Sequence, residues 1–366
     1  MRSFLACVAI AALAACTNDH GTQTRLDWTE VANSHAQCFQ VFARGDERKV
    51  IVFGPGGRSD TLAVYLKGTG EDDIENDATD LAPLDRIAVL STTHLPFISA
   101  LDRVDRVVAA TNVGRIRDVA TLERIAQGAV REIATADGID REQLLLAKAQ
   151  AVFDYPFGQA AHRVTSPDQL FIPVTEYLEE HPLGRAEWIR FFGVLLDAEQ
   201  RADGLYATIE ERYARASAFA ANRTDRPRVF FGSAWQGQWH IPPGNSYMAH
   251  LLNDAGGDYC FSDRTSSGNI AIDLETVITE ARAADRFGII LEHGGELHRI
   301  DIAGGDERIV ALPVMRSGAF YFDNERSDIF GQALLEPDVI LEELNCFFYP
   351  GKCPVRAAKY VFAPIQ

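Results

Sequence analysis

The order of apolar and polar positions changes character along the chain. Between Cys38 and Leu66, short runs rich in β-branched and aromatic residues are separated by Gly, Pro and Asp, which predicts two or three antiparallel strands. From Asp85 onward, apolar runs alternate with amphipathic stretches, and a second such series starts at Pro227. Alternation of strands and helices is typical of a parallel, open α/β sheet. The pattern therefore predicts an α/β protein with two open α/β lobes and an N-terminal antiparallel β extension.

The segment between the two series has helical periodicity only. One helix is expected over about 184–196 and a second over 198–221, where apolar residues recur at three- and four-residue steps. At 1.5 Å per residue the second helix would be about 36 Å long, enough to run rigidly along both lobes, although an ordinary surface helix gives the same pattern. The expected division is an N-terminal lobe over 28–183 (β extension 28–70, α/β part 85–183), a helical segment over 184–222 and a C-terminal lobe over 223–366.

A short sequence pattern occurs once in each lobe. IDREQLL at 139–145 matches IDLETVI at 272–278, and each copy reads as a helix start. Asp140 and Asp273 suit the N-cap, and Glu142 and Glu275 fall in the first turn, where the helix dipole favours an anion. The echo indicates equivalent positions in two similar lobes, with chance similarity of two capped helices as the alternative.

The first residues have the pattern of an export signal. One basic residue is followed by an uncharged run that is too short to span a bilayer, which predicts a signal peptide over 1–15. Residues 13–16 resemble a bacterial lipobox, so we expect lipidation of Cys16 and a lipid-anchored tether over 16–27. An ordinary signal peptide cut nearby is the alternative.

Charge and cysteine content narrow the choice of partner and compartment. The 366 residues carry 35 Lys and Arg against 52 Asp and Glu, a net charge of -17 that would repel nucleic acid. Cys346 and Cys353 flank a segment whose Pro and Gly favour a turn, and an exported chain can form this disulfide. Cys38 and Cys260 are either free thiols or a second bridge.

Common catalytic motifs are missing from the sequence. GxSxG, HExxH and the P-loop pattern do not occur, which argues against an enzyme. The segment LEHGGELH at 291–298 contains His and Glu side chains, but its two glycines favour a surface loop, with adventitious metal binding as the alternative. We expect no cofactor and no structural metal.

Aromatic side chains gather in a polar segment after the first strand of the second lobe. Trp235, Trp239 and Tyr247 lie among Gly, Gln and Pro, which predicts a loop at the carboxyl end of a strand, where open α/β sheets bind ligands. A core role for one Trp is the alternative. In the first lobe, residues 91–94 occupy the corresponding turn, where a plain N-cap is the alternative reading.

Several segments in order carry a resemblance. RIAVLSTTHLPFISALD, IDREQLLLAKAQAVFDY, PLGRAEWIRFFGVLLDAEQ, GQWHIPPGNSYMAHLL and LEPDVILEELN together resemble the periplasmic substrate-binding proteins of ABC importers for iron-siderophores, haem and cobalamin. The resemblance covers about Asp85 to the C-terminus. It implies two lobes bridged by a rigid helix, a ligand between them and no catalysis. It also implies an acidic residue on each lobe that docks on the permease, and Glu142 and Glu275 match those positions. The C-terminal CFFYPGKC departs from the His-Pro segment of relatives.

On this resemblance we expect a monomeric, lipid-anchored periplasmic receptor that delivers a ferric siderophore to an ABC permease dimer. Cobalamin and haem are the alternative ligands, for which His94, Tyr155 or His240 would serve as axial donor. An exported metal-dependent or carbohydrate-active enzyme and a divalent-metal receptor are the other classes. The expected ligand contacts are His94, Tyr155, Trp235, Trp239, Tyr247 and Arg316, the last either neutralising an anionic ligand or forming a surface ion pair.

Overall fold

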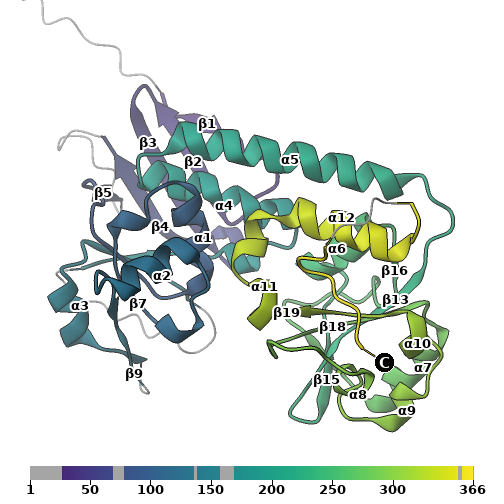
Figure 1. The fold of residues 1–366 in the computed structure, drawn as a ribbon. Helices are drawn as coiled ribbons and strands as arrows, with labels where there is room; N and C mark the ends of the chain where they lie inside the picture. Colours follow the sequence, from purple (N-terminus) through teal and green to yellow (C-terminus); the bar gives the residue numbers. More distant parts are fainter. Residues whose placement is uncertain (1–26, 69–77, 136–137, 157–168, 353–356, 366) are drawn as a thin grey trace, which may run out of the picture.

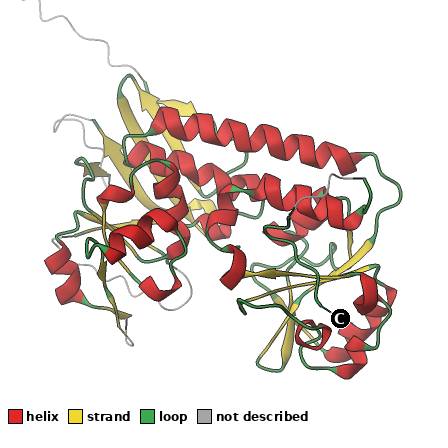
Figure 2. Cartoon of the chain, viewed as in Figure 1, coloured by secondary structure: helices red, strands yellow, loops and turns green. Residues whose placement is uncertain are grey.

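Two lobes lie beneath a shared layer of helices in the computed structural model, which describes residues 27–68, 78–135, 138–156, 169–352 and 357–365 (Figure 1). Each lobe is built on its own sheet, with helices and strands interleaved (Figure 2). The predicted fold class, two open α/β lobes with a β extension, is confirmed. The predicted signal peptide and nearly all of the tether, including Cys16, lie outside the described residues.

The β extension is a five-stranded sheet, larger than the two or three strands that the sequence predicted. Its strands run in the order β1-β2-β3-β4-β5; β1 to β4 are antiparallel and β5 is parallel to β4. The turn between β3 and β4 uses Gly57 at φ +63, a conformation that glycine adopts without strain. The strands are β1 (Thr29–Val31), β2 (Phe39–Arg44), β3 (Glu47–Gly54), β4 (Gly57–Lys67) and β5 (Thr79–Leu81).

The N-terminal lobe has a parallel sheet of order β12-β11-β6-β7-β8. The inner strands of this sheet are almost entirely apolar and buried, as expected where both faces are covered, whereas the edge strand β8 is charged and exposed. The strands are β6 (Ile87–Val89), β7 (Val107–Ala110), β8 (Arg131–Glu132), β11 (Ala151–Asp154) and β12 (Leu170–Pro173), and β9 (Ala134–Thr135) and β10 (Gly138–Ile139) form a separate pair. The helices are η2 (Thr92–His94), α1 (Leu95–Ala100), η3 (Val104–Arg106), η4 (Val113–Arg115), α2 (Val119–Ala126), α3 (Arg141–Ala147) and η6 (Glu176–Leu178).

The C-terminal lobe has a parallel sheet of order β16-β13-β18-β19 and a small antiparallel sheet of order β14-β15-β17. The parallel strands are β13 (Arg228–Phe231), β16 (Asp258–Tyr259), β18 (Arg286–Leu291) and β19 (Ala319–Asp323); the others are β14 (Ser233–Trp235), β15 (Gln238–Ile241) and β17 (Ile270–Ile272). The helices are α6 (Tyr247–Asp254), α7 (Leu274–Ala283), α8 (Arg299–Ile302), α9 (Glu307–Val310), α10 (Val314–Ser317), α11 (Asn324–Ser327), η7 (Gln332–Leu335) and α12 (Pro337–Phe348).

Helices α4 (Pro182–Leu195) and α5 (Glu199–Ala221) form the layer above the lobes together with α12 (Figure 1). The helix expected over 198–221 is α5. Its buried Tyr206 belongs to the core of the N-terminal lobe, whereas Tyr213 and Ala216 belong to the core of the C-terminal lobe. One unbroken helix therefore contributes to both cores, which makes a wide hinge motion costly.

Two buried carboxylates, Glu187 in α4 and Glu179 just before α4, hold the chain just before β2. Glu187 of α4 accepts hydrogen bonds from the backbone N–H groups of Ser34, His35 and Ala36 at 2.7–2.8 Å. Glu179 accepts from the backbone N–H of Cys38 at 2.8 Å. Since no helix or strand satisfies these N–H groups, the two carboxylates attach the β extension to the helical layer.

The cysteines of the described residues agree in part with expectation. Cys38 and Cys260 are free thiols, one of the two alternatives left open by the sequence. Cys346 lies in α12, but Cys353 lies outside the described residues, so their bridge stays a prediction. None of the helices in the described ranges is both long and apolar enough to cross a membrane.

Candidate functional site

The carboxyl ends of the parallel strands in the two lobes are turned toward each other. Arg117, which follows β7, reaches Glu292 and Glu325, which follow β18 and β19, at 3.5 and 2.7 Å. Figure 1 shows α11, which continues from β19, at the edge of the C-terminal lobe that lies nearest the N-terminal lobe. Because ligands of open α/β sheets bind beyond the carboxyl ends of the strands, the candidate site lies between the lobes.

In the N-terminal lobe the strand ends carry a buried carboxyl group. Oε1 of Glu176 accepts a hydrogen bond from the Thr93 hydroxyl at 2.7 Å, and that hydroxyl lies 2.9 Å from the hydroxyl of Ser91. Oε2 of Glu176 has no partner among the described residues. Burial raises the pKa of Glu176 to about 7. This group therefore changes its charge near neutral pH.

Aromatic rings and one guanidinium join the lobes beside Glu176. The Tyr155 and Tyr177 rings lie 4.7 Å apart, and Arg185 of α4 donates to the backbone oxygen of Tyr177 at 3.0 Å. The Arg185 guanidinium also lies 4.7 Å from the centre of the Tyr247 ring, at the start of α6 in the other lobe. We call Tyr155, Glu176, Tyr177, Arg185 and Tyr247 the junction cluster.

The junction cluster contains polar atoms with unused hydrogen-bonding capacity. The Tyr247 hydroxyl is buried without a partner among the described residues, and burial raises the pKa of Tyr247 to about 12. The guanidinium of Arg185 supplies positive charge next to it. Aromatic faces with a few convergent polar groups are typical of sites for partly apolar small molecules. The cluster thus brings together two of the predicted contacts, Tyr155 and Tyr247.

His94 does not lie at this site, and its assignment as a ligand contact is wrong. Its side chain is fully buried, with ring centres 6.0 Å from Phe192 and 6.5 Å from Phe153, and neither ring nitrogen has a partner. The residue ends η2, and this turn directs the ring into the core rather than out of the strand end. Burial lowers the pKa of His94 to about 3.

We expect replacement of His94 with leucine to make the protein less sensitive to acid. The unfolded chain binds a proton at His94 below its ordinary pKa of 6.5, whereas the folded chain does not do so until about 3, so stability falls as the pH drops through this interval. Between pH 7 and about pH 4.5 the wild type should lose about 2–3 kcal/mol more unfolding free energy than the variant. Urea unfolding at both pH values measures this difference. The exposed His293→Leu is the control, and equal acid losses in His94→Leu and wild type would contradict the prediction.

The two tryptophans of the aromatic segment have opposite environments. The segment forms a hairpin of β14 and β15 instead of the predicted loop. Trp235 is 66% exposed, whereas Trp239 is 6% exposed and packs edge-on against Phe230 and Phe287. Trp239 is therefore a core residue, and its assignment as a ligand contact is wrong.

Arg316 lies at the wrong end of the sheet for a ligand contact. It belongs to α10, which precedes β19, so it stands at the amino end of a strand whose carboxyl end faces the other lobe. Its side chain is exposed, and its backbone oxygen accepts from Arg299. Arg316 therefore lies apart from the junction cluster.

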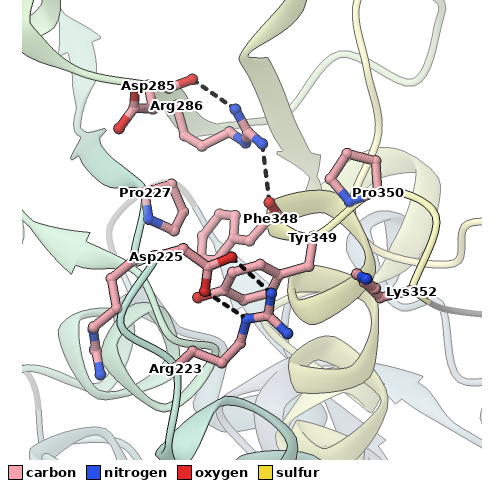
Figure 3. A pocket seen from close by; sticks show the side chains of 10 residues that line it. Arg223, Asp225, Pro227, Asp285, Arg286, Phe348, Tyr349, Pro350 and Lys352 are labelled. Carbon is pink, nitrogen blue, oxygen red and sulfur yellow. Dashed lines mark hydrogen bonds and ion pairs between the residues drawn. The ribbon is translucent and has the colours of Figure 1, made fainter.

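A recess of about 380 Å³ lies at this opposite edge of the C-terminal lobe (Figure 3). Several of its guanidinium groups are already engaged: Arg286 donates to the backbone oxygen of Phe348 at 3.0 Å, and Arg223 forms a bidentate pair with Asp225. Arg226 donates to two further carbonyls near the end of α6. Arg226 and Arg286 satisfy carbonyls at or near helix ends and Arg223 is paired with a carboxylate, so we assign the recess a structural role.

After Leu291, the last residue of β18, the segment 292–298 is a loop that leads to α8, as the sequence predicted. Its backbone is fixed by Asp323, which accepts from the N–H groups of His293 and Gly294 at 3.0 Å. Within the described ranges no group of His, Cys, Asp and Glu side chains is arranged to hold a metal ion.

Sequence reasoning missed Arg117, Glu176, Tyr177 and Arg185. Glu176 follows a strand, the position at which ligand contacts are expected in an open α/β sheet, so PVTEYLEE at 173–180 contained a usable signal. Arg117 also follows a strand, after a short η4 turn. Arg185 lies within α4, and only the packing of α4 against α6 brings it to Tyr247.

Comparison with known proteins identifies the family. A family model described as "Periplasmic binding protein" matches residues 87–287, more than half of the chain. The chain belongs to this family. A curated relative, an uncharacterized lipoprotein of Methanocaldococcus jannaschii, is 25% identical over 218 residues, which are 56% of this chain and 51% of the relative. The chain thus spans about half the length of that relative.

Solved structures resemble this periplasmic binding protein in fold. A periplasmic haem-binding protein of Pseudomonas aeruginosa is 15% identical, with a TM-score of 0.59, over 77% of this chain and 99% of that one. An Fe3+-hydroxamate transport protein of Saccharomonospora viridis is 19% identical, with a TM-score of 0.55, over 73% and 94%. A periplasmic vitamin B12 binding protein of Vibrio cholerae is 13% identical, with a TM-score of 0.52, over 73% and 97%. The family consists of solute-binding proteins and not of enzymes, as expected for this chain.

Proposed function

We propose that this periplasmic binding protein captures a ferric siderophore outside the cytoplasm and delivers it to an ABC permease. The observation that carries the proposal is the junction cluster, which lies between two sheets whose carboxyl ends face each other. Its aromatic faces suit a large and partly apolar chelate, and Arg185 suits a chelate with anionic oxygens. Solved relatives that bind haem, ferric hydroxamate and vitamin B12 support this ligand class, and cobalamin or haem is the second candidate.

The proposed ligand contacts are Tyr155 and Tyr247 of the junction cluster and the exposed Trp235. Only Gly232, Ser233 and Ala234 separate Trp235 from the last residue of β13, so Trp235 lies near the carboxyl end of that strand. An exposed tryptophan is costly to leave in water and is a frequent anchor for a bound partner.

A thermal-shift screen tests the proposed function. Ferric siderophores of several classes, haem and cobalamin are added singly, with iron-free siderophores and divalent metal salts as separate arms. Free ligand at 100 times its Kd adds about 2.7 kcal/mol to the unfolding free energy, which gives a clear rise in Tm. Tyr155→Ala should reduce the shift, and Arg316→Ala, at the opposite edge of the lobe, should keep it. Stabilisation by a metal salt alone, or by none of the chelates, would overturn the proposal.

We also propose that Cys16 carries a lipid anchor, which the lipoprotein name of the curated relative supports. Lipidation with more than one acyl chain would hold the protein on a membrane. Fractionation of cells that express Cys16→Ser tests this proposal: the variant should appear in the soluble periplasmic fraction, and continued membrane retention would contradict it.

Glu142 and Glu275 are proposed as permease-docking residues. They lie in the first turns of α3 and α7, which Figure 1 shows in different lobes, and both side chains are exposed. The N-caps of these helices are Asp140 and Asp273, which accept from backbone N–H groups at 3.0 and 2.7 Å. Because the aspartates already cap the helices, capping does not require the glutamates.

In the double variant Glu142→Gln and Glu275→Gln we expect an unchanged fold and unchanged ligand affinity but a loss of uptake. Exposed charges at an interface mainly set the encounter rate and its salt dependence, so the loss should be largest at low salt. Uptake of labelled ligand by cells and Tm of the purified protein measure the two properties. Glu123→Gln with Glu211→Gln removes two other exposed charges and is the control. Normal uptake by the Glu142/Glu275 variant would leave these residues without a docking role.

A further inference from the structure

Arg117 forms an ion-pair network between the two lobes. One terminal nitrogen of its guanidinium lies 2.7 Å from Glu325 Oε2 and 3.5 Å from Glu292 Oε1. Its Nε donates to the backbone oxygen of Glu325 at 3.3 Å, and the other terminal nitrogen donates to the backbone oxygen of Arg115 at 2.7 Å. The Arg117 side chain is 19% exposed. Arg117 and Glu325 are 208 positions apart in the sequence.

Both sides of this network are held by other carboxylates. In the C-terminal lobe, fully buried Asp323 accepts hydrogen bonds from the backbone N–H groups of His293 and Glu325. Glu325 is itself a partner of Arg117, and His293 follows the other partner, Glu292. In the N-terminal lobe, Glu132 accepts from the backbone N–H groups of Asn112 and Val113 and fixes the turn after β7. The guanidinium and its partners therefore meet in a defined geometry without further ordering of either lobe.

The lobes have another set of contacts at the helical layer. There Arg185 stacks on Tyr247, and Glu180, just before α4, accepts a hydrogen bond from the side-chain amide of Asn245. These contacts lie next to α4 and α5. Because these helices are continuous, they do not provide a flexible hinge between the lobes. Arg117 instead joins the loops that follow β7 and β18 to the short helix α11 that follows β19, and rotation of side chains is enough to separate these partners.

We propose that Arg117 is a latch that sets the separation of the two lobes at the strand ends. With its ion pairs formed, the segments that follow β7, β18 and β19 are held together. With the ion pairs broken, these segments separate while α5 keeps the lobes in register. The step from latch to solute capture rests on the proposed function, because solute entering between the lobes must first displace this network. Arg117 is thus a positioning residue that affects the rate of solute entry through lobe separation.

Fluorescence energy transfer tests the latch without any solute. Dyes are attached through unnatural amino acids at Glu123 in α2 and Thr279 in α7, both exposed, in the full chain. Arg117→Gln should lengthen the mean dye separation. The charge exchange Arg117→Glu with Glu325→Arg should return it toward the wild-type value, and Arg115→Gln, which removes a neighbouring charge of the same loop, should leave it unchanged. Raising salt to about 1 M, where screening acts within roughly 3 Å, should lengthen the separation in the wild type but not in Arg117→Gln.

The outcomes separate the latch from the proposed function. An unchanged separation in Arg117→Gln, or equal lengthening in Arg115→Gln, overturns the latch even if a chelate binds. If the separation responds as expected while no chelate stabilises the protein, the latch stands and the proposed function fails. Where a chelate does bind, stopped-flow mixing should show association with Arg117→Gln several-fold faster than with the wild type, and slower or equal association would overturn the role in solute entry.

Discussion

Replacing Glu187 with alanine is expected to lower the unfolding free energy by about 3–5 kcal/mol, the range for removing one partner of a buried charged network. The Glu187 side chain is fully buried and accepts three backbone hydrogen bonds from Ser34, His35 and Ala36. It also pairs with Arg190 at 2.7 Å. The substitution would leave three N–H groups without an acceptor, and each such loss costs about 1–3 kcal/mol unless water replaces it.

The comparison that isolates this effect is a second glutamate of the helical layer. Glu211 of α5 is exposed and pairs across one helical turn with Arg215, so Glu211→Ala should change stability by less than about 0.5 kcal/mol. Urea unfolding followed by circular dichroism gives both free energies. Similar values for the two variants would mean that the segment before β2 is not held by Glu187.

Local signals in the sequence were enough to predict the helices α3, α4, α5 and α7 and the type of each lobe. Asp140 and Asp273 were recognisable as N-caps because each is a short polar residue with a glutamate two positions later, in the first turn. This signal involves a few neighbouring residues. The spacing of apolar residues likewise predicted α5. These features depend on the backbone within a few residues, so no knowledge of distant packing was needed.

The direction of individual side chains could not be predicted in the same way. His94 ends a turn of 3-10 helix, where neither the two-residue period of a strand nor the helical period sets which side it faces. Arg316 was placed near the ligand because it adjoins a strand, but residues before and after a parallel strand lie at opposite edges of the sheet. Whether a polar residue comes before or after a parallel strand therefore decides at which edge of the sheet it lies.

The contacts that join distant segments had no signal in the sequence at all. Arg117 and Glu325 are 208 residues apart in the sequence, and Ser34 and Glu187 are 153 residues apart. A charged residue in a sequence of this composition is most often solvated, since charged residues are rarely buried without a partner. Only the fold shows which of the 52 acidic residues are paired or buried.

Trp235 and Trp239 lie in the same hairpin, but one is exposed and the other is buried. The turn between β14 and β15 consists of Gln236 and Gly237, both at positive φ, which is the conformation of a tight hairpin. Along β15, Trp239 and Ile241 then face the core while Gln238 is exposed. Trp235 pairs across the hairpin with Gln238 and is exposed with it.

We therefore expect Trp239→Ala to lower the unfolding free energy by about 3–5 kcal/mol, the usual cost of truncating a large buried aromatic side chain. The indole packs against Phe230 and Phe287, and a Cβ built on Gly304 would lie 3.3 Å from it, so these rigid neighbours leave a cavity when it is removed. Trp235→Ala, with 66% of the side chain already in water, should change stability by less than about 0.5 kcal/mol. Urea unfolding of the two variants at pH 7 measures both values. Equal midpoints for the two variants would place Trp239 at the surface and make it a candidate ligand contact again. The expected difference would mean that any loss of solute binding in Trp239→Ala results from destabilisation of the C-terminal lobe.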